Sequence, residues 1–252
     1  MDLELHGNVA VITGGASGIG LACAQQLSRE GCDVALWDVA RDVSGVAADL
    51  AKQFGRRAIG IPVDVSKLES VKAALDKTEN ELGPVTHLVH SAAVTSGQFG
   101  FPFTNVATTS WQRVLDVNVM GMVHVAQLVA PGMISRHAGT MVFVASVAGQ
   151  IGSQTDPPYS ASKAAVIALT KSIGKERADT AICVNCVTPA AVKTPIFDQL
   201  TPEHIQFMLS KIPMGRFGTP EEIAAMVAWL CTDDCSFSTG AVFDLSGGRS
   251  TY

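Results

Sequence analysis

The sequence predicts an α/β protein with a doubly wound parallel sheet. Short apolar runs rich in Val and Ile alternate with longer amphipathic stretches along the 252 residues. The short runs are apolar on both faces, which is typical of parallel strands that helices cover from both sides. With 47% hydrophobic residues and a mean hydropathy of +0.27, the chain can fill a sizeable core.

The predicted elements alternate between strand and helix. Strands are expected at 9–14, 33–38, 58–64, 85–92, 140–146, 181–188 and 241–245, and helices at 18–31, 43–55, 70–83, 111–137, 158–178 and 220–231. Because no Gly/Ser-rich or Pro-rich linker interrupts this order, we expect residues 1–252 to form a single domain. The segment 189–219 is too long for an ordinary connection and follows the carboxyl end of a strand, so we expect a substrate loop there.

Composition narrows the classes of function. A formal net charge of −5 leaves no basic stripe for nucleic acid. The first residues lack the features of a signal peptide, and the apolar runs fall short of the roughly 20 residues that cross a bilayer. We therefore expect a soluble, cytoplasmic protein without a membrane or nucleic-acid partner.

Two of the six cysteines, Cys183 and Cys186, form a Cys-x-x-Cys pattern. Their offset of three residues places the two thiols on opposite faces of a predicted strand, so they cannot converge on one ion. We expect reduced cysteines and no metal site.

A glycine-rich segment, TGGASGIG at 13–20, joins the first strand to the first helix. Gly14, Gly18 and Gly20 lack side chains where the backbone would approach a pyrophosphate at a helix N-terminus. This pattern is typical of a Rossmann-like dinucleotide-binding turn, although a glycine-rich turn without a ligand reads the same way.

Acidic residues end the second and third strands. Asp38 stands eighteen residues after Gly20, where a carboxylate accepts hydrogen bonds from an adenosine ribose and repels a 2′-phosphate. Asp38 therefore favours NAD over NADP as the cofactor. NADP stays an alternative because Arg41 lies nearby in the sequence. Asp64 is either a capping residue or an adenine contact.

Tyr159 and Lys163 in YSASK are four residues apart and would share a helix face. An ammonium near the phenol would favour phenolate, lowering a pKa that is ordinarily about 10 and allowing acid or base catalysis. On its own the pair is more typical of two polar residues at the start of a helix than of a catalytic pair.

Combined with Asn118, Ser146 and the glycine-rich segment, this pair resembles the short-chain dehydrogenase/reductase family over the full chain. The resemblance implies that Tyr159 exchanges a proton with the substrate oxygen while a hydride moves to or from the nicotinamide. Lys163 would lower the tyrosine pKa and hold the nicotinamide ribose. Ser146 would orient the substrate oxygen, and Asn118 would position a water that links the lysine to solvent.

The same resemblance assigns further cofactor contacts. They are Gly14, Ser17, Gly18, Ile19, Gly20, Asp38, Asp64, Val65, Ala92, Tyr159, Lys163, Val192 and Thr194. The chain departs from the family at Ala190, where glycine is usual, and at HSAA, 90–93, where Asn-Asn-Ala-Gly is common. His90 there could be pH-sensitive or a hydrogen-bonded structural residue.

The C-terminal FDLSGGRSTY is similar to family members that oxidise 2-keto-3-deoxy sugar acids of the L-rhamnonate or L-fuconate type. A sugar acid needs a cation, and Arg249 is a candidate, although a mobile terminal arginine is the alternative. Gln150, Ser146 and Tyr159 are the other expected substrate contacts, with Phe197 and Gln199 completing a polar pocket.

We therefore expect an NAD-dependent enzyme that reversibly oxidises a secondary alcohol on a hydroxylated small molecule. The alternatives are an NADPH-dependent 3-oxoacyl (acyl-carrier-protein) reductase, a non-catalytic NAD-sensing protein and a scaffold subunit. The family resemblance further implies a homotetramer formed through the helices at 111–137 and 157–178 and the last strand.

Overall fold

A computed structural model describes residues 3–98, 100–194 and 202–250 of the chain. Its centre is a sheet of seven parallel strands in the order β3-β2-β1-β4-β5-β6-β7. The strands are β1 (Val9–Thr13), β2 (Asp33–Asp38), β3 (Ala58–Pro62), β4 (His87–His90), β5 (Gly139–Val144), β6 (Ile182–Pro189) and β7 (Val242–Leu245). The order reverses between β1 and β4, which is where open α/β sheets bind ligands.

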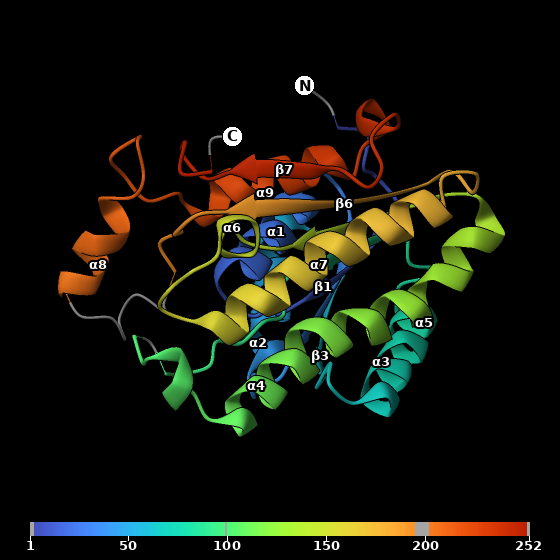
Figure 1. The fold of residues 1–252 in the computed structure, drawn as a ribbon. Coiled ribbons are helices and arrows are strands. Elements are labelled where there is room, and N and C mark those ends of the chain that lie inside the picture. The colour runs from blue at the N-terminus through green and yellow to red at the C-terminus, as the bar shows by residue number, and fades with distance from the viewer. Residues whose placement is uncertain (1–2, 99, 195–201, 251–252) are drawn as a thin grey trace.

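Helices cover both faces of this sheet (Figure 1). They are α1 (Gly18–Arg29), α2 (Val43–Phe54), α3 (Leu68–Glu81), α4 (Thr108–Leu115), α5 (Gly121–Arg136), α6 (Val147–Ile151), α7 (Pro157–Glu176), α8 (Pro202–Leu209) and α9 (Pro220–Leu230), with short 3-10 turns at Phe103–Asn105 and Asp233–Cys235. Helices α1, α2 and α9 pack on one face, and α3, α5 and α7 on the other. The predicted doubly wound parallel sheet is confirmed.

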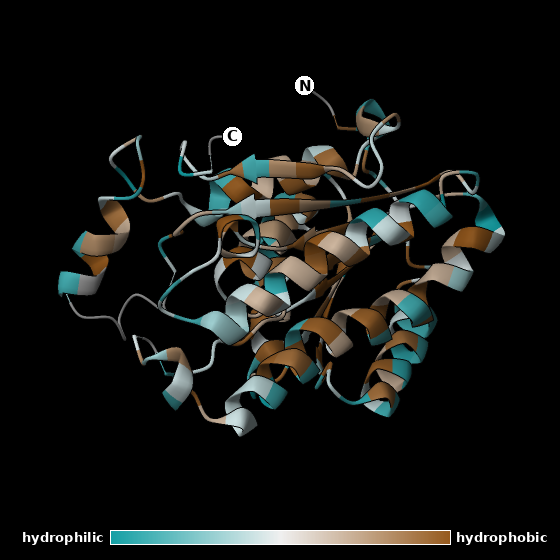
Figure 2. Cartoon of the chain, viewed as in Figure 1, coloured by the Kyte–Doolittle hydropathy of each residue, from teal (hydrophilic) through white to brown (hydrophobic). Residues whose placement is uncertain are grey.

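The core consists of two layers, one on each face of the sheet. Successive strand residues point to opposite faces, so Ile12 and Leu36 pack under α1 and α9, whereas Val11 and Trp37 pack under α3 and α5. In Figure 2 the strands are mostly hydrophobic, whereas the helices that cover them change between hydrophobic and hydrophilic along their length. Burial of both faces explains why the strands read as continuous apolar runs.

Helix α4, a π-helical turn (Asp116–Met120) and helix α5 form one helix from Thr108 to Arg136. It is long and apolar enough to cross a membrane by length and composition alone. Here its buried side, which includes Val125, Val129 and Met133, packs against the sheet as a core helix. The sequence predicted the helix but neither its π-turn nor the short α6 that follows β5.

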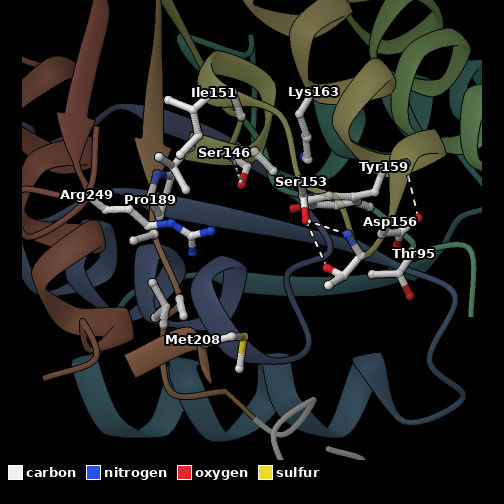
Figure 3. Close-up of a pocket in the computed structure, with 18 of the residues that line it drawn as sticks. Thr95, Ser146, Ile151, Ser153, Asp156, Tyr159, Lys163, Pro189, Met208 and Arg249 are labelled. Carbon is white, nitrogen blue, oxygen red and sulfur yellow. Dashed lines mark hydrogen bonds between the residues drawn. The ribbon is translucent and has the colours of Figure 1, made fainter. Parts of the chain in front are cut away.

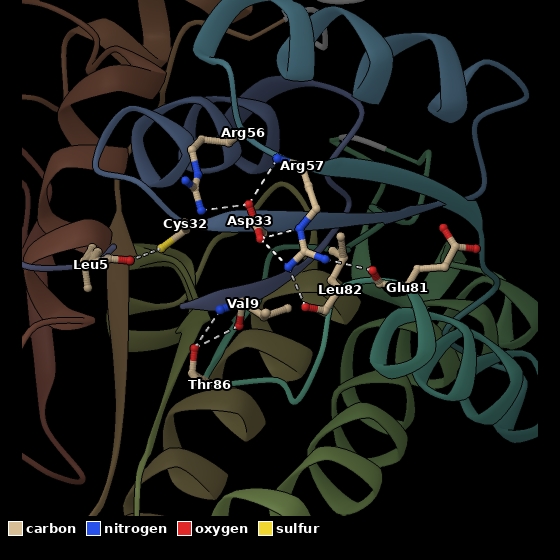
Figure 4. A network of polar contacts seen from close by, with 9 residues as sticks. All are labelled: Leu5, Val9, Cys32, Asp33, Arg56, Arg57, Glu81, Leu82 and Thr86. Carbon is tan, nitrogen blue, oxygen red and sulfur yellow. Dashed lines mark hydrogen bonds and ion pairs between the residues drawn. The ribbon is translucent and has the colours of Figure 1, made fainter. Parts of the chain in front are cut away.

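A charged network lies at the amino-terminal ends of the strands, on the side of the sheet away from the ligand-binding cleft (Figure 4). Asp33, at the start of β2, pairs with Arg56 at 3.0 Å and Arg57 at 2.6 Å, and its side chain is only 6% exposed. Arg57 also donates to the carbonyls of Glu81 and Leu82 at the end of α3. One buried carboxylate thus ties β2, the α2–β3 turn and α3 together.

Asp33→Asn is expected to lower the free energy of unfolding by about 2–3 kcal/mol, because it removes the charge that two arginines share at a buried position. Part of each arginine is solvated, which keeps the loss below that of a fully buried pair. Urea unfolding followed by circular dichroism measures it. The matched control is Lys77→Met at the exposed Lys77–Glu81 pair, expected to change stability by less than about 0.5 kcal/mol. Equal losses in both variants would contradict this role of Asp33.

Candidate active site

Two adjoining cavities open at the carboxyl ends of the strands. One, of about 570 Å³, is lined by Ser146, Tyr159, Lys163 and the C-terminal Arg249 (Figure 3). The other, of about 640 Å³, is lined by the glycine-rich turn and by Asp38 and Asp64. Ile19, Ser91, Ala93 and Thr194 line both, so the two cavities form one continuous cleft.

The glycine-rich turn lies in this cleft as expected. Gly14 has a φ of +65°, and a Cβ there would come within 3.0 Å of the backbone of Ala92. Gly14, Ser17, Gly18 and Ile19 line the second cavity, together with Val65 and Ala92. Gly20 lines neither cavity; a Cβ there would lie 2.1 Å from the carbonyl oxygen of Gly14, so this glycine lets helix α1 pack against the turn.

Asp38 and Asp64 both reach the second cavity. The Asp38 carboxylate accepts hydrogen bonds from the amides of Ala16 and Ala40, each at 3.0 Å, which hold it at the end of β2 with lone pairs to spare. Asp64 accepts from the amide and the hydroxyl of Ser66. A site with this turn and an oriented carboxylate fits an adenosine ribose and pyrophosphate.

Tyr159, Lys163 and Ser146 meet in the first cavity. Helix α7 carries the tyrosine and the lysine, and the ammonium of Lys163 lies 5.6 Å from the centre of the phenol ring. Lys163 is buried and donates to the carbonyl of Val144 at 2.7 Å. Ser146 is the N-cap of α6 and also hydrogen-bonds the Tyr159 side chain.

The electrostatics of this group differ from the expected lowering of the tyrosine pKa. Burial raises the pKa of Tyr159 to about 12, with the Ser146 hydrogen bond opposing and the Asp156 carboxylate adding to the rise. Burial also lowers the pKa of Lys163 to about 8. In the protein alone the pKa of Tyr159 is therefore raised and not lowered, because the loss of water around the phenol is the largest cause of the shift.

Asn118 lies in the π-helical turn and is fully buried. Its amide oxygen accepts from the Val94 amide at 2.8 Å, and its nitrogen donates to the Val94 carbonyl and the Ser162 hydroxyl at 2.9 Å. The side chain thus joins the segment after β4 to the helix that carries Tyr159. Insertions of this kind in a helix are frequent at functional sites.

The segment after β6 also reaches the cleft. Val192 pairs with Gly218 in an isolated bridge, and Val192 and Thr194 line the first cavity. Ala190, at the position of the usual glycine, donates its amide to the carbonyl of Leu245. Farther along the predicted substrate loop, α8 and the residues after it contribute Met208 and Lys211 to the lining. Phe197 and Gln199 lie outside the described residues.

The C-terminal segment folds over the first cavity. Arg249 projects into it, opposite Tyr159 in Figure 3, and burial lowers the pKa of its guanidinium. Ser250 donates its hydroxyl to Gln150 at 2.8 Å and its amide to Ser246, which anchors the segment to α6. Gln150, an expected substrate contact, is not among the described residues lining this cavity and instead holds the residue next to Arg249. Tyr252 lies outside the described residues.

His90, at the start of the unusual HSAA, is a hydrogen-bonded buried residue. The Thr13 hydroxyl accepts from the amides of Ser91 and Ala92, so its hydrogen points to His90 Nδ1, 3.0 Å away. His90 then carries its proton on Nε2, which has no partner among the described protein atoms. Burial, with a smaller contribution from Lys163, lowers the pKa of His90 to about 3, and burial lowers the pKa of His87 to about 4.

These two histidines predict acid sensitivity. Their folded pKa values lie below the ordinary value of 6.5, so the unfolded chain binds more protons between about pH 3 and 6.5. The stability that they contribute is complete above pH 6.5 and is lost as the pH falls through this window. The urea midpoint should therefore drop between pH 7.5 and 5, and His90→Asn should reduce that drop. An identical pH dependence in wild type and variant would contradict the assignment.

Several lining residues were missed by the sequence prediction, namely Thr95, Ser153, Thr155, Asp156, Met208 and Lys211. Only Asp156 left a signal, because an aspartate before Pro157 and Pro158 is a typical N-cap, and its carboxylate does accept from the Tyr159 amide. No described group of His, Cys, Asp and Glu side chains is arranged to hold a metal ion, and none of the six cysteines is in a disulfide.

A parallel sheet with a glycine-rich turn after β1, an oriented carboxylate after β2 and a tyrosine, lysine and serine around one cleft defines a nicotinamide-dependent oxidoreductase. A family model described as Enoyl-(Acyl carrier protein) reductase matches residues 14–250. The chain belongs to the short-chain dehydrogenase/reductase family.

Its relatives act on differing substrates. The chain is 42% identical to a 2-dehydro-3-deoxy-L-rhamnonate dehydrogenase (NAD(+)) of Sphingomonas sp., covering 98% of this chain and 96% of the relative. It is 34% identical to a 3-oxoacyl-(acyl-carrier-protein) reductase of Thermotoga maritima, over 98% and 99%. The fold is also similar to the structure of L-sorbose reductase from Gluconobacter frateurii with NADPH and L-sorbose. The superposition covers 100% of each chain, with a TM-score of 0.91 and 29% sequence identity. The protein is thus an oxidoreductase of this family that acts on hydroxylated substrates.

Proposed function

We propose that the protein is an NAD-dependent dehydrogenase that oxidises a secondary alcohol on a hydroxylated carboxylic acid, with a 2-keto-3-deoxy sugar acid as the leading substrate. The observation that carries this proposal is the guanidinium of Arg249 in the cavity that holds Ser146 and Tyr159. Among the described lining residues, Lys163, Lys211 and Arg249 are cations and Asp156 is the one acid. A cavity with this balance favours an anionic substrate.

Four residues of this chain would perform the chemistry. Ser146 orients the substrate hydroxyl and Tyr159 takes its proton, while Lys163 holds the cofactor ribose and keeps a positive charge near the phenol. When bound, NAD would supply the acceptor for the hydride of the carbinol carbon and a positive charge that favours phenolate. Asn118 holds the segment after β4 against α7 and so fixes the tyrosine and the lysine relative to the cofactor.

The cofactor is NAD, bound along the second cavity. Its pyrophosphate would be held by Gly14, Ser17, Gly18 and Ile19, where helix α1 begins, while Gly20 supports the turn. The Asp38 carboxylate, held by two amides, accepts from the ribose diol and would repel a 2′-phosphate. Asp64, Val65 and Ala92 border the adenosine, and Val192 and Thr194 the nicotinamide. The dependence of the Sphingomonas relative on NAD(+) supports this preference.

A second candidate, an NADPH-dependent 3-oxoacyl (acyl-carrier-protein) reductase, has support in the Thermotoga relative. Asp38 argues against its cofactor, and the charged cavity argues against an acyl chain. A non-catalytic NAD sensor would not need the Ser146, Tyr159 and Lys163 arrangement.

We also propose a single-domain subunit that forms a homotetramer in the cytoplasm. The helix from Thr108 to Arg136 is strongly apolar, yet only 39% of its most apolar 18-residue window is buried in the subunit, and Met120 is 44% exposed. Association through this helix and α7 would cover that surface. Light scattering that shows a monomer at micromolar concentration would contradict the assembly.

The test of the function is the formation of NADH or NADPH, followed at 340 nm, against sugar acids, sugars, polyols and keto acids. We expect the highest kcat/KM for 2-dehydro-3-deoxy sugar acids with NAD, and at least a tenfold lower kcat/KM with NADP. Asp38→Ser should reduce the ratio of kcat/KM with NAD to kcat/KM with NADP. Asp42 is exposed, and Asp42→Ser is the matched control that should leave this ratio unchanged. A wild-type preference for NADP would overturn the cofactor assignment.

A further inference from the structure

The wall of the first cavity opposite Arg249 is polar, and none of its side chains is among the four that would perform the proposed reaction. It consists of Thr95, Ser153, Thr155 and Asp156, which we call the hydroxyl wall. In Figure 3, Thr95, Ser153 and Asp156 lie on the Tyr159 side of the cavity, whereas Arg249 and Pro189 lie on the other side, with Ser146 between them. The reaction centre therefore separates a cationic side from a hydroxyl-bearing side.

The hydroxyls of this wall have unused hydrogen-bonding capacity. Ser153 and Thr155 share one hydrogen bond at 2.9 Å, and Ser153 also accepts from the Thr155 amide, so one of their two hydroxyl hydrogens has no acceptor among the described residues. The hydroxyl of half-buried Thr95 makes no hydrogen bond within the described part of the chain. The wall thus offers two donors to a ligand.

Asp156 supplies the matching acceptor. Asp156 is only 3% exposed, and its two carboxylate oxygens accept hydrogen bonds from the amides of Tyr159 and Ser96 at 3.4 and 3.2 Å. These are long bonds, they use two of about four acceptor positions, and none of the described cations pairs with the carboxylate. A buried carboxylate in this state is stabilised by a further donor.

We propose that the hydroxyl wall binds a second hydroxyl group of the substrate, on the side of the reacting carbon opposite the carboxylate. A sugar hydroxyl both donates and accepts, which matches the two free donors and the open carboxylate of the wall. An acyl chain that displaced water would leave the two free donors and the open acceptor positions of Asp156 without partners. This inference rests on the proposed function, because it adds a distal hydroxyl to the carboxylate that Arg249 would bind.

Two pairs of acids that differ in one distal hydroxyl test the inference. They are 4-hydroxypentanoate with 4,5-dihydroxypentanoate, and 3-hydroxybutyrate with 3,4-dihydroxybutyrate. The measurements are kcat/KM with NAD and the Kd of each acid for the enzyme–NADH complex by calorimetry, where no turnover occurs. In at least one pair, the wild type should prefer the dihydroxy acid by about 10- to 30-fold. Equal affinity within both pairs would overturn the proposal.

Substitutions in the hydroxyl wall test whether its residues cause the preference for the dihydroxy acid. Thr155→Val, Thr95→Val and Asp156→Asn each remove one group with little change of shape, and asparagine still caps α7. Each should reduce the ratio between the two acids of the preferred pair at least threefold, and because the ratio is taken within one protein, partial misfolding cancels. Thr180→Val, whose hydroxyl bonds the Arg177 carbonyl at the far end of α7, is the matched control and should keep the wild-type ratio. An unchanged ratio in all three wall variants would contradict the proposal.

The Arg249→Met variant separates this inference from the proposed function. It should weaken both acids of a pair equally and leave their ratio intact. If Arg249→Met has no effect on either acid while the ratio responds to the wall variants, the carboxylate assignment fails and the hydroxyl wall stands. If Arg249→Met weakens both acids but the wall variants leave their ratio unchanged, the hydroxyl wall proposal fails and the carboxylate assignment stands.

Discussion

Tyr159→Phe is expected to lower kcat by about 10³- to 10⁴-fold, which is the contribution of a positioned acid or base. Phenylalanine keeps the ring beside Lys163 but removes the hydroxyl that bonds Ser146. The Kd of NAD, measured by calorimetry, should change by less than about threefold, since the remaining cofactor contacts are unaltered. Turnover within tenfold of wild type would contradict the role of Tyr159.

The pH dependence of the same step follows from the two pKa values. In the protein alone, burial keeps Tyr159 protonated at neutral pH, with a pKa of about 12, so it is ready to donate a proton for reduction of a ketone. Oxidation of the alcohol requires the phenolate, so kcat/KM for oxidation should rise with pH. The kcat/KM for reduction of the ketone should not rise. Loss of the Lys163 ammonium near its pKa of about 8 should limit the rise. An oxidation rate that falls between pH 6 and 8 would contradict this assignment.

Arg249→Met is expected to lower kcat/KM for carboxylate substrates by about 100-fold, because a charged hydrogen-bonding partner in a partly buried cavity is lost. Neutral polyols should be affected less than threefold. Arg249→Lys should recover part of the loss, since lysine restores the charge but not the two-pronged geometry. The measurement is the initial rate of NADH formation with 2-dehydro-3-deoxy-L-rhamnonate.

Lys211→Met is the matched control for this variant. Lys211 also lines the cavity but is exposed, with its ammonium 5.1 Å from the ring centre of Phe207. Its removal should cost less than about fivefold, because an exposed charge interacts weakly. Equal losses at Lys211 and Arg249 would indicate general attraction of anions and would contradict a specific role of Arg249.

The parts of the fold that the sequence predicted are those with local causes. Apolar runs such as 9–13 and 33–38 have the strand period and length of doubly covered strands, and the glycine-rich turn stands between the first strand and helix. The Tyr159–Lys163 spacing likewise follows from one helix turn. These patterns require no knowledge of distant contacts.

The parts that the sequence did not predict depend on contacts between distant segments. The sequence offered Arg249 as a candidate but not the contact that holds its segment over the cavity, which is the bond from Ser250 to Gln150, one hundred residues earlier. Thr95 and Thr155 meet in one wall only after β4 and α7 are assembled. The raised pKa of Tyr159 arises from burial by these same segments, which residue spacing does not reveal.

Arg249 is expected to select a carboxylate for the reaction centre at Ser146 and Tyr159. The most direct test of this role compares kcat/KM with NAD for 2-dehydro-3-deoxy-L-rhamnonate and for its neutral amide, in the wild type and in Arg249→Met. The wild type should prefer the acid by about 50-fold or more, and the variant should have lost that preference. A wild-type enzyme that oxidises the amide as well as the acid, or a preference that survives in Arg249→Met, would contradict this role of Arg249.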